Sequence, residues 1–326
     1  MEAKDRIIVA LDVDSLDKAK SLVESLAPHV GCFKVGLELL TAVGAPKVVE
    51  FVHSLGGQIF YDGKFNDIPN TVGGAAKAVA GLNVKMFNVH ASAGRKAVEA
   101  AVTNKGSSLV LGVTILTSID EEECVSIFGG KPGAKVLQFS RMLKEVGADG
   151  IICSPQELEL LGKQKELDSL LKITPGVRPE WAAAGDQKRI MTPAEAIKAG
   201  ATALVIGRPI TKPPAEIGTP ADAAKKIAEE ISEILEWLKK DARCHDYELH
   251  YRGPYDLDVG PAHGDYHELN WQDCSCIIRA ENDEEAWKIT MQFLEDEVGR
   301  VYSEGAWHNR KLIKLTKIIG NQEVKP

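Results

Sequence analysis

The stretch "YDGKFNDIPN", residues 61–70, concentrates ionisable side chains directly after an apolar pair. Asp62, Lys64 and Asp67 lie within six positions of one another. Charges at the end of a buried strand cost free energy unless they are paired. The triplet is therefore either a solvated loop with incidental salt bridges or part of an active site. Which of the two holds depends on the strands and helices that position it.

Together with Lys34, this triplet could form an array of alternating charges, in which mutual attraction keeps both lysines protonated. An acid in such an array would repel a substrate carboxylate placed beside it. Loss of that carboxylate as CO₂ relieves the repulsion, and a fixed ammonium can stabilise and then protonate the carbanion left behind. No pattern marks a pyridoxal-phosphate lysine, a flavin site or a metal triad. The array is sufficient chemistry for a cofactor-free decarboxylation, but does not prove one.

Short apolar runs alternate with amphipathic segments over residues 1–237. The expected strands are residues 6–13, 32–38, 58–64, 84–91, 108–116, 150–155, 171–177 and 203–210. Segments between them space their apolar residues three and four apart, as helices do; examples are residues 16–27, 45–56, 71–82 and 192–200. Such β/α units predict an α/β fold, a (β/α)₈ TIM barrel. A doubly wound sheet is the competitor, but the first turn, "LDVDSLDKA", lacks the glycine-rich fingerprint.

Active sites of these barrels lie at the carboxyl ends of the strands. The polar residues expected there are Asp12, Lys34, Asp62, Lys64, Asn88, His90, Thr117, Ser118, Arg178 and Arg208. An ordinary packed core would not place so many charges at equivalent ends of several strands. This convergence predicts that the charged triplet is functional.

Gly207 and Arg208 follow the last expected strand, where barrel enzymes commonly bind phosphate. Backbone N–H groups can cradle the anion there, and an arginine adds a charge-assisted contact. The preceding loop, residues 174–193, carries Arg178 and Gln187 and could fold over a phosphate as a lid. We therefore predict a phosphate site.

The composition is that of an ordinary globular protein: 326 residues, 44% hydrophobic and 26% charged. The net charge of -8, without any basic block, argues against a nucleic-acid partner. No apolar run predicts a membrane span, and the amino-terminal stretch does not resemble a signal peptide. Cys32, Cys124 and Cys153 stand singly in apolar surroundings, which indicates reduced thiols and a cytoplasmic location.

The composition changes near residue 240, so we expect two domains: a barrel over 1–240 and a small α+β appendage of unknown function over 241–326. The appendage pattern indicates a strand at 274–280, a helix at 282–302 and a strand at 310–319. Its histidines and cysteines could bind zinc in a binding or regulatory module, although their spacing matches no standard structural zinc pattern. The candidates are Cys244, His245, His250, His263, His267, Cys274 and Cys276. We therefore expect ordinary polar side chains and no metal site.

The chain resembles the orotidine 5′-monophosphate decarboxylases over residues 5 to about 237. The matching stretches, in the family's order, are "VALDVD", "FKVGLELL", "DGKFNDIPNTV", "NVHASAG", "VTILTSID", "TPGVRPE…GDQKRIMTP" and "VIGRPIT". The resemblance implies decarboxylation of orotidylate to UMP, the last step of de novo pyrimidine synthesis. It also implies a homodimer without metal or organic cofactor.

The resemblance further implies a role for each matching residue. Lys64 would protonate C6, Asp62 would face the substrate carboxylate, and Lys34 would bridge the ribose and the charge array. Asp67 and Thr71 would reach the active site of the neighbouring subunit. The other implied contacts are Asp12 with the ribose, Thr117 and Ser118 with the pyrimidine, and Arg178, Gln187, Gly207 and Arg208 with the phosphate.

Two positions depart from the family pattern. Leu37 stands where many bacterial members have lysine, and Gly63 stands where leucine is commoner. Glycine inside a strand weakens it, so we expect Gly63 to loosen the strand at the array, with a modest cost in stability or rate.

Two other functions remain open for the barrel. A related magnesium-dependent decarboxylase or aldolase acting on sugar phosphates would share the D-x-K-x-x-D pattern. Such enzymes carry a carboxylate where this chain has Lys34, however, and lack the "IPNTV" and "GDQ" stretches. The barrel could also be an inactive scaffold for the appendage, although all of its charged positions are intact.

Overall fold

A computed structural model describes residues 1–182, 191–243, 245–254, 271–280, 282, 285–289, 311–317 and 322–323. The chain divides into two units, Met1–Leu235 and Glu236–Pro326. The domain boundary that we expected at residue 240 lies inside the helix α11 (Pro220–Arg243).

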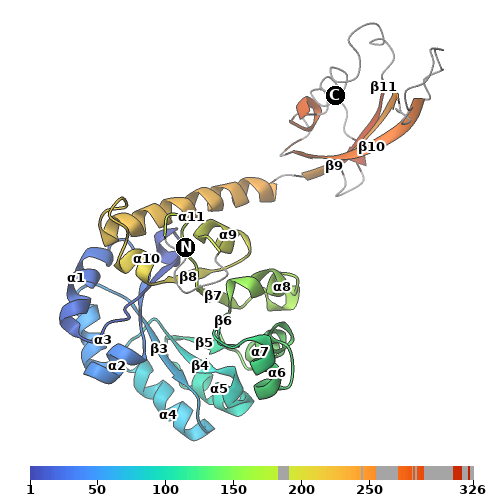
Figure 1. The fold of residues 1–326 in the computed structure, drawn as a ribbon. Coiled ribbons are helices and arrows are strands. Elements are labelled where there is room, and N and C mark those ends of the chain that lie inside the picture. The colour runs from blue at the N-terminus through green and yellow to red at the C-terminus, as the bar shows by residue number, and fades with distance from the viewer. Residues whose placement is uncertain are drawn as a thin grey trace. The chain divides into compact units, whose positions relative to one another are not determined.

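The first unit is a closed barrel of eight parallel strands in chain order (Figure 1). The strands are β1 (Ile7–Ala10), β2 (Cys32–Val35), β3 (Ile59–Phe65), β4 (Met86–His90), β5 (Leu109–Val113), β6 (Gly150–Ile152), β7 (Leu171–Pro175) and β8 (Ala203–Ile206). The barrel closes where Val9 of β1 pairs with Phe33 on one side and Ile206 on the other. This confirms the predicted (β/α)₈ fold.

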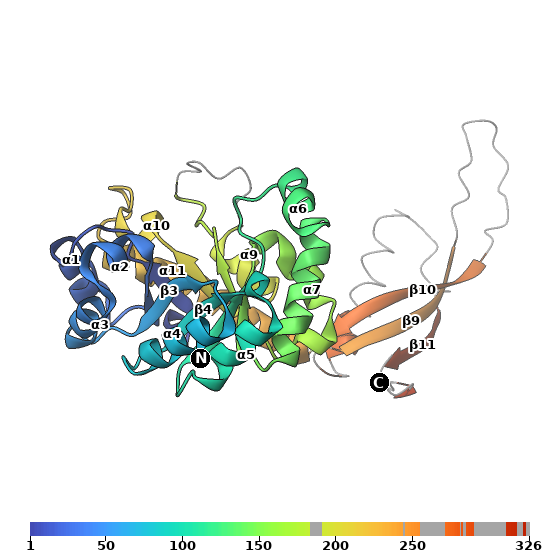
Figure 2. The same ribbon diagram turned by 90° about the horizontal axis from the view of Figure 1, so that it is seen from below.

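Helices connect consecutive strands and surround the barrel (Figure 2). They are α1 (Leu16–Leu26), α2 (Leu37–Val43), α3 (Ala45–Ser54), α4 (Pro69–Ala80), α5 (Arg95–Thr103), α6 (Glu121–Phe128), α7 (Pro132–Glu145), α8 (Leu158–Gly162), α9 (Pro193–Lys198), α10 (Arg208–Thr211) and α11. Short 3₁₀ turns span Lys4–Arg6, Ala91–Ala93, Pro155–Glu157 and Lys165–Leu167. None of the described helices combines the length and apolar composition that crossing a bilayer requires.

Seven of the eight expected strands extend past the observed carboxyl ends, and two of them, the second and the eighth, run into α-helices. β2 ends at Val35 and β8 at Ile206, because Gly36 and Gly207 are the N-caps of the helices that follow. Residues 37–38 and 208–210 therefore begin helices. An apolar run cannot distinguish the end of a strand from the first turn of a helix by periodicity alone.

The barrel interior is filled by alternating, inward-facing side chains. One buried cluster contains Ile8, Ala10, Cys32, Phe60, Met86, Leu111, Ile173, Ala203 and Val205. Because side chains on a strand alternate with a period of two, the next inward positions along β2, β3 and β4 are Lys34, Asp62 and Asn88. A polar layer thus lies directly beyond the apolar core, toward the carboxyl ends of the strands.

The second unit contains a four-stranded antiparallel sheet in the order β10-β9-β11-β12. Its strands are β9 (His245–Pro254), β10 (Trp271–Ala280), β11 (Lys311–Lys317) and β12 (Gln322–Glu323), and residues 285–289 are helical. β9 was not predicted, because its sequence mixes charged and aromatic residues without an apolar run. The side chains that could bind zinc lie outside the described part of the chain, so this hypothesis is not tested by the structure.

The barrel's three cysteines are buried free thiols. Burial raises the pKa of Cys32 and of Cys153 to about 12. These thiols are therefore inert core residues, as their apolar sequence context predicted.

Glu157, which follows β6, should make the stability of the barrel depend on pH. Burial raises the pKa of its carboxyl from 4.5 to about 7, against a 2.8 Å hydrogen bond from the Ser154 backbone N–H. Because the folded state binds this proton more tightly than the unfolded state, stability is lost as the pH rises from 4.5 through about 7. The loss should reach ~3 kcal/mol.

Urea denaturation at about pH 5 and pH 8 tests this effect. The Glu157→Gln variant keeps an acceptor for the Ser154 N–H but cannot ionise. It should match the wild type at the lower pH and exceed it in free energy of unfolding at the higher pH. Parallel pH profiles for the two proteins would show that Glu157 does not hold a proton in the folded state.

Candidate active site

Four charged side chains meet at the carboxyl ends of β1, β2 and β3. The Lys34 ammonium lies 3.1 Å from Asp12 Oδ1 and 3.3 Å from Asp62 Oδ2. The Lys64 ammonium lies 2.7 Å from Asp62 Oδ1. The order is therefore acid, base, acid, base, with the Asp62 carboxylate held between two cations. We call Asp12, Lys34, Asp62 and Lys64 the charge array; it contains Asp12 where the array expected from the sequence contained Asp67.

Asp62 is the most buried member, with a side chain 9% exposed. Burial by itself raises the pKa of this carboxyl, but Lys34, Lys64 and a hydrogen bond from Asn88 outweigh it, so that the pKa is lowered below 3.8. Asp62 is consequently ionised at neutral pH. Burial, with a further contribution from the Lys64 charge, also lowers the pKa of nearby His90 against the opposing effect of Asp62, so His90 is neutral there.

The backbone of β3 is irregular at the array. Tyr61 pairs with Phe87 of β4, but the next pair joins Phe65 to Val89, so three residues of β3 face one residue of β4. Within this bulge Lys64 has φ +48°, in the left-handed region. That conformation costs a non-glycine residue about 1–2 kcal/mol, and such strain persists only where surrounding contacts stabilise it.

The side chain opposite this bulge is Asn88, which is completely buried. Its Oδ1 accepts a 2.7 Å hydrogen bond from the Lys64 backbone N–H. Its Nδ2 donates a 2.6 Å hydrogen bond to Asp62 Oδ1. The strand-end pattern in the sequence included Asn88, but nothing in that pattern assigned it a role.

From the sequence we expected Gly63 to loosen the strand. In the structure Gly63 also has a packing role beside Tyr61. A Cβ atom at this position would lie 2.3 Å from Cε1 of the Tyr61 ring. That ring packs against Phe65, which in turn packs against Phe87, with 5.9 Å between ring centroids in both pairs. The glycine therefore makes room for an aromatic ring that fills the space beside the bulge.

A cavity of about 200 Å³ opens on the array. Lys34, Asp62 and Lys64 form its charged side. The remaining lining is largely apolar and consists of Phe60, Val113, Ile115, Leu116, Thr117, Ile152, Cys153, Pro175 and Val205. A planar ring with an acidic substituent directed at the lysines would suit such a cavity.

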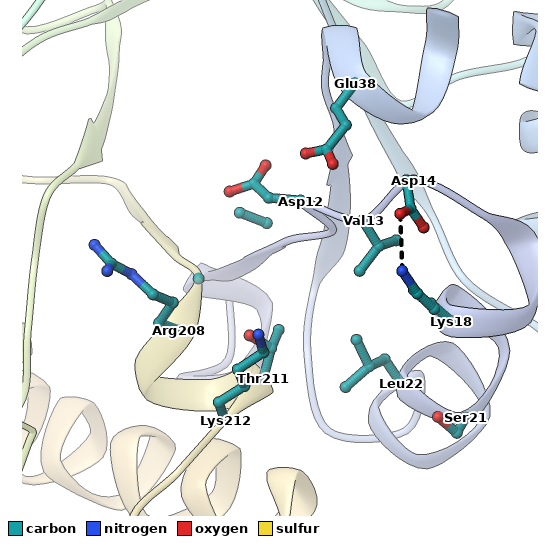
Figure 3. A pocket seen from close by; sticks show the side chains of 12 residues that line it. Asp12, Val13, Asp14, Lys18, Ser21, Leu22, Glu38, Arg208, Thr211 and Lys212 are labelled. Carbon is teal, nitrogen blue, oxygen red and sulfur yellow. Dashed lines mark hydrogen bonds and ion pairs between the residues drawn. The ribbon is translucent and has the colours of Figure 1, made fainter. Parts of the chain in front are cut away.

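A second, larger cleft of about 730 Å³ lies on the other side of Asp12. Asp12, Gly207 and Arg208 line it, together with residues of α1, α2 and α10. Figure 3 shows the Asp12 carboxylate and the Arg208 guanidinium pointing toward the same open space, while Lys18 is paired with Asp14. The Lys34–Asp12 ion pair joins the two hollows, because Lys34 lines the first and Asp12 the second.

The other predicted site residues lie around these hollows. Thr117 lines the smaller cavity, whereas Ser118 is exposed beside it. Arg178 is 8% exposed, and its backbone N–H donates to the Met191 carbonyl across the base of the loop 174–193. Gln187 lies outside the described residues.

Asp67 and Thr71 are exposed. The Asp67 carboxylate accepts the backbone N–H of Ile68, which precedes α4. Within the described part of the chain, no ion pair joins Asp67 to Lys34 or Lys64. The neighbouring apolar side chain of Ile68 is 66% exposed.

An eight-stranded α/β barrel with a charge array over an apolar cavity defines a barrel enzyme for a small anionic ligand. Comparison with known proteins narrows this class. Residues 5–227 match the model of the orotidine 5′-phosphate decarboxylase / HUMPS family. The chain belongs to that family.

Several relatives support this membership. The orotidine 5′-phosphate decarboxylase of Heliobacterium modesticaldum is 46% identical over 246 residues, covering 72% of this chain and 99% of the relative. That of Syntrophomonas wolfei is 44% identical over 245 residues and is covered completely. The crystal structure of the Lactobacillus acidophilus enzyme superposes with a TM-score of 0.59 at 34% identity, covering 69% of this chain and 98% of that one.

Proposed function

We propose that this protein decarboxylates orotidine 5′-phosphate to UMP, the final step of de novo pyrimidine nucleotide synthesis. The observation that carries the proposal is the Asp62 carboxylate held between Lys34 and Lys64 at the mouth of an apolar cavity. The curated relatives of this family that match the chain are named for the same reaction. The reduced, buried cysteines agree with a cytoplasmic enzyme.

The substrate occupies both hollows, with a different part of it in each. The pyrimidine enters the smaller cavity against Thr117 and Ser118, while the ribose lies at the Asp12–Lys34 ion pair. The phosphate extends to Gly207 and Arg208, with Arg178 and Gln187 contributing from the preceding loop. An arginine guanidinium can bind such a phosphate through paired, charge-assisted hydrogen bonds.

In the bound complex the carboxylate at C6 lies against Asp62, so that two negative charges oppose each other. The bond from C6 to the carboxylate breaks, CO₂ departs, and the electron pair stays on C6. Lys64, whose ammonium touches Asp62, stabilises this pair and donates a proton to it. The residues that perform the reaction are thus Lys34, Asp62 and Lys64, with Asp67 from a second subunit.

Two copies of the chain are needed for a complete site in this proposal. Asp67 and Thr71 are exposed, and the exposed Ile68 beside Asp67 supplies apolar surface for a subunit contact. Each subunit would therefore lend Asp67 and Thr71 to the active site of its partner.

The decisive experiment follows the absorbance of orotidylate with the purified protein, with and without an excess of a metal chelator. We expect loss of substrate, formation of UMP and CO₂, and the same rate in both conditions. A protein without activity on orotidylate would overturn the proposal. Turnover of sugar phosphates that stops with chelator would instead identify the magnesium-dependent relatives.

The appendage should be dispensable for this reaction. The Heliobacterium relative is matched over 99% of its length by only 72% of this chain. A variant that ends at Arg243, the last residue of α11, should keep kcat/KM within about twofold of the full chain, since a domain with its own core can fold alone. A folded variant without activity would show that the appendage contributes to catalysis.

A further inference from the structure

We propose that Asn88 is a positioning residue for decarboxylation, which holds the Lys64 backbone and the Asp62 carboxylate in one shared arrangement. The inference rests on the proposed function, because it concerns how the charge array is built. It begins at the bulge in β3, where Asn88 is the one residue of β4 that faces Asp62, Gly63 and Lys64.

The direction of the Lys64 side chain depends on its left-handed backbone. In a regular strand the side chains of residues two apart are parallel and point to the same face of the sheet. Here the bulge and the φ of +48° let the ammonium turn back to within 2.7 Å of Asp62 Oδ1. Asn88 Oδ1 accepts the Lys64 backbone N–H at 2.7 Å, which gives this strained peptide a partner.

The orientation of the Asn88 amide follows from chemistry. A backbone N–H can only donate, so the atom that faces Lys64 is the oxygen. The amide NH₂ must then face Asp62, to which it donates at 2.6 Å. Asp62 Oδ1 therefore receives hydrogen bonds from both Asn88 and Lys64, while Oδ2 faces Lys34.

In this arrangement few other groups could take over the two hydrogen bonds of Asn88. The residue is completely buried, so water does not replace its hydrogen bonds. The charged and titratable groups around Asp62 are Lys34 on β2, Lys64 on β3 and His90 on β4. Both lysines are long and flexible, whereas the short Asn88 side chain has little freedom. It is the rigid member that sets the carboxylate plane.

Two variants and one control test the inference. Asn88→Ala removes both hydrogen bonds, and Asn88→Asp keeps an acceptor for the Lys64 N–H but faces Asp62 with a second carboxylate. The control is Ser108→Ala, because Ser108 is also buried and its Oγ donates a 2.7 Å bond to the Val84 carbonyl, before β4. Kinetics with orotidylate, UMP binding by calorimetry and thermal melting are measured for each.

We expect Asn88→Ala to lower kcat by about 100-fold, the effect of a small misplacement of reacting groups. UMP affinity should stay within about threefold, and Ser108→Ala should keep the wild-type kcat, as expected of a change confined to a distant hydrogen bond. For Asn88→Asp, two facing carboxylates share a proton at lower pH. The ratio of its kcat to that of the wild type should therefore increase as the pH is lowered from about 8 to about 6.

The outcomes separate this inference from the proposed function. A wild type that is inert toward orotidylate overturns the proposed function itself. An active wild type with Asn88→Ala within about threefold of it overturns the positioning role. So does an equal loss in Ser108→Ala, or a parallel loss of UMP binding. If Asn88→Ala does not fold, Asn88→Asp decides the question. A kcat ratio of Asn88→Asp to wild type that is low at every pH overturns the positioning role.

Discussion

Replacement of Lys64 by alanine should lower kcat for orotidylate by about 10⁴-fold or more, since it removes the proposed general acid and a fixed charge together. The Lys64 ammonium lies 2.7 Å from Asp62 and lines the cavity proposed for the pyrimidine. Without it, the electron pair left on C6 has neither a counter-charge nor a proton donor. The absorbance assay with orotidylate measures the effect.

The fold should survive this change. Asp62 retains Lys34 at 3.3 Å and the hydrogen bond from Asn88, so the carboxylate is not left buried and unpaired. A matched control is Lys105→Ala, which removes an ammonium 2.6 Å from the Asp149 carboxylate. Lys105 follows α5 and Asp149 directly precedes β6, and neither belongs to the array. This control should keep its activity. An equal loss in both variants would mean that instability, not chemistry, explains the result.

A second variant separates charge from proton transfer. Lys64→Arg keeps a positive charge, but a guanidinium does not lose its proton in proteins and is therefore a poor proton donor. It should bind UMP yet remain far below the wild type in kcat. Wild-type turnover by Lys64→Arg would contradict the assignment of Lys64 as the acid.

Two inactive variants should restore activity when they form a hybrid dimer. In the proposed dimer, Asp67→Asn damages the site of the partner, whereas Lys64→Ala damages the site of its own barrel. In a hybrid of the two, one site carries both defects and the other carries none. Hybrids isolated with two different affinity tags should therefore show about half of the wild-type activity, because a two-fold dimer has two equivalent sites.

The control hybrid combines Lys64→Ala with Lys34→Ala. Both of these residues belong to the array of their own barrel, so each site in the hybrid has one defect and activity should stay at the level of the single variants. If the Asp67→Asn hybrid is as inactive as this control, Asp67 does not serve a neighbouring subunit.

Much of the barrel could be predicted from local patterns. Alternation of apolar runs with amphipathic segments is set by the periods of strands and helices, which are properties of neighbouring residues. The ends of β2 and β8 were wrong for the same reason, because the decision at Gly36 and Gly207 depends on how the following turn packs. β9 was missed because its residues lack the apolar run by which the other strands were recognised.

The sequence by itself determined that Asp62 and Lys64 stand two residues apart at the end of a strand, and that Lys34 and Asp12 end neighbouring strands. Their meeting follows from the parallel barrel. Only the tertiary structure decided how they meet: through a bulge, a left-handed Lys64 and the buried amide of Asn88. The physical reason is that the register between β3 and β4 is a long-range property. Residues 24 and 26 positions apart form these two hydrogen bonds, and no local pattern encodes that pairing.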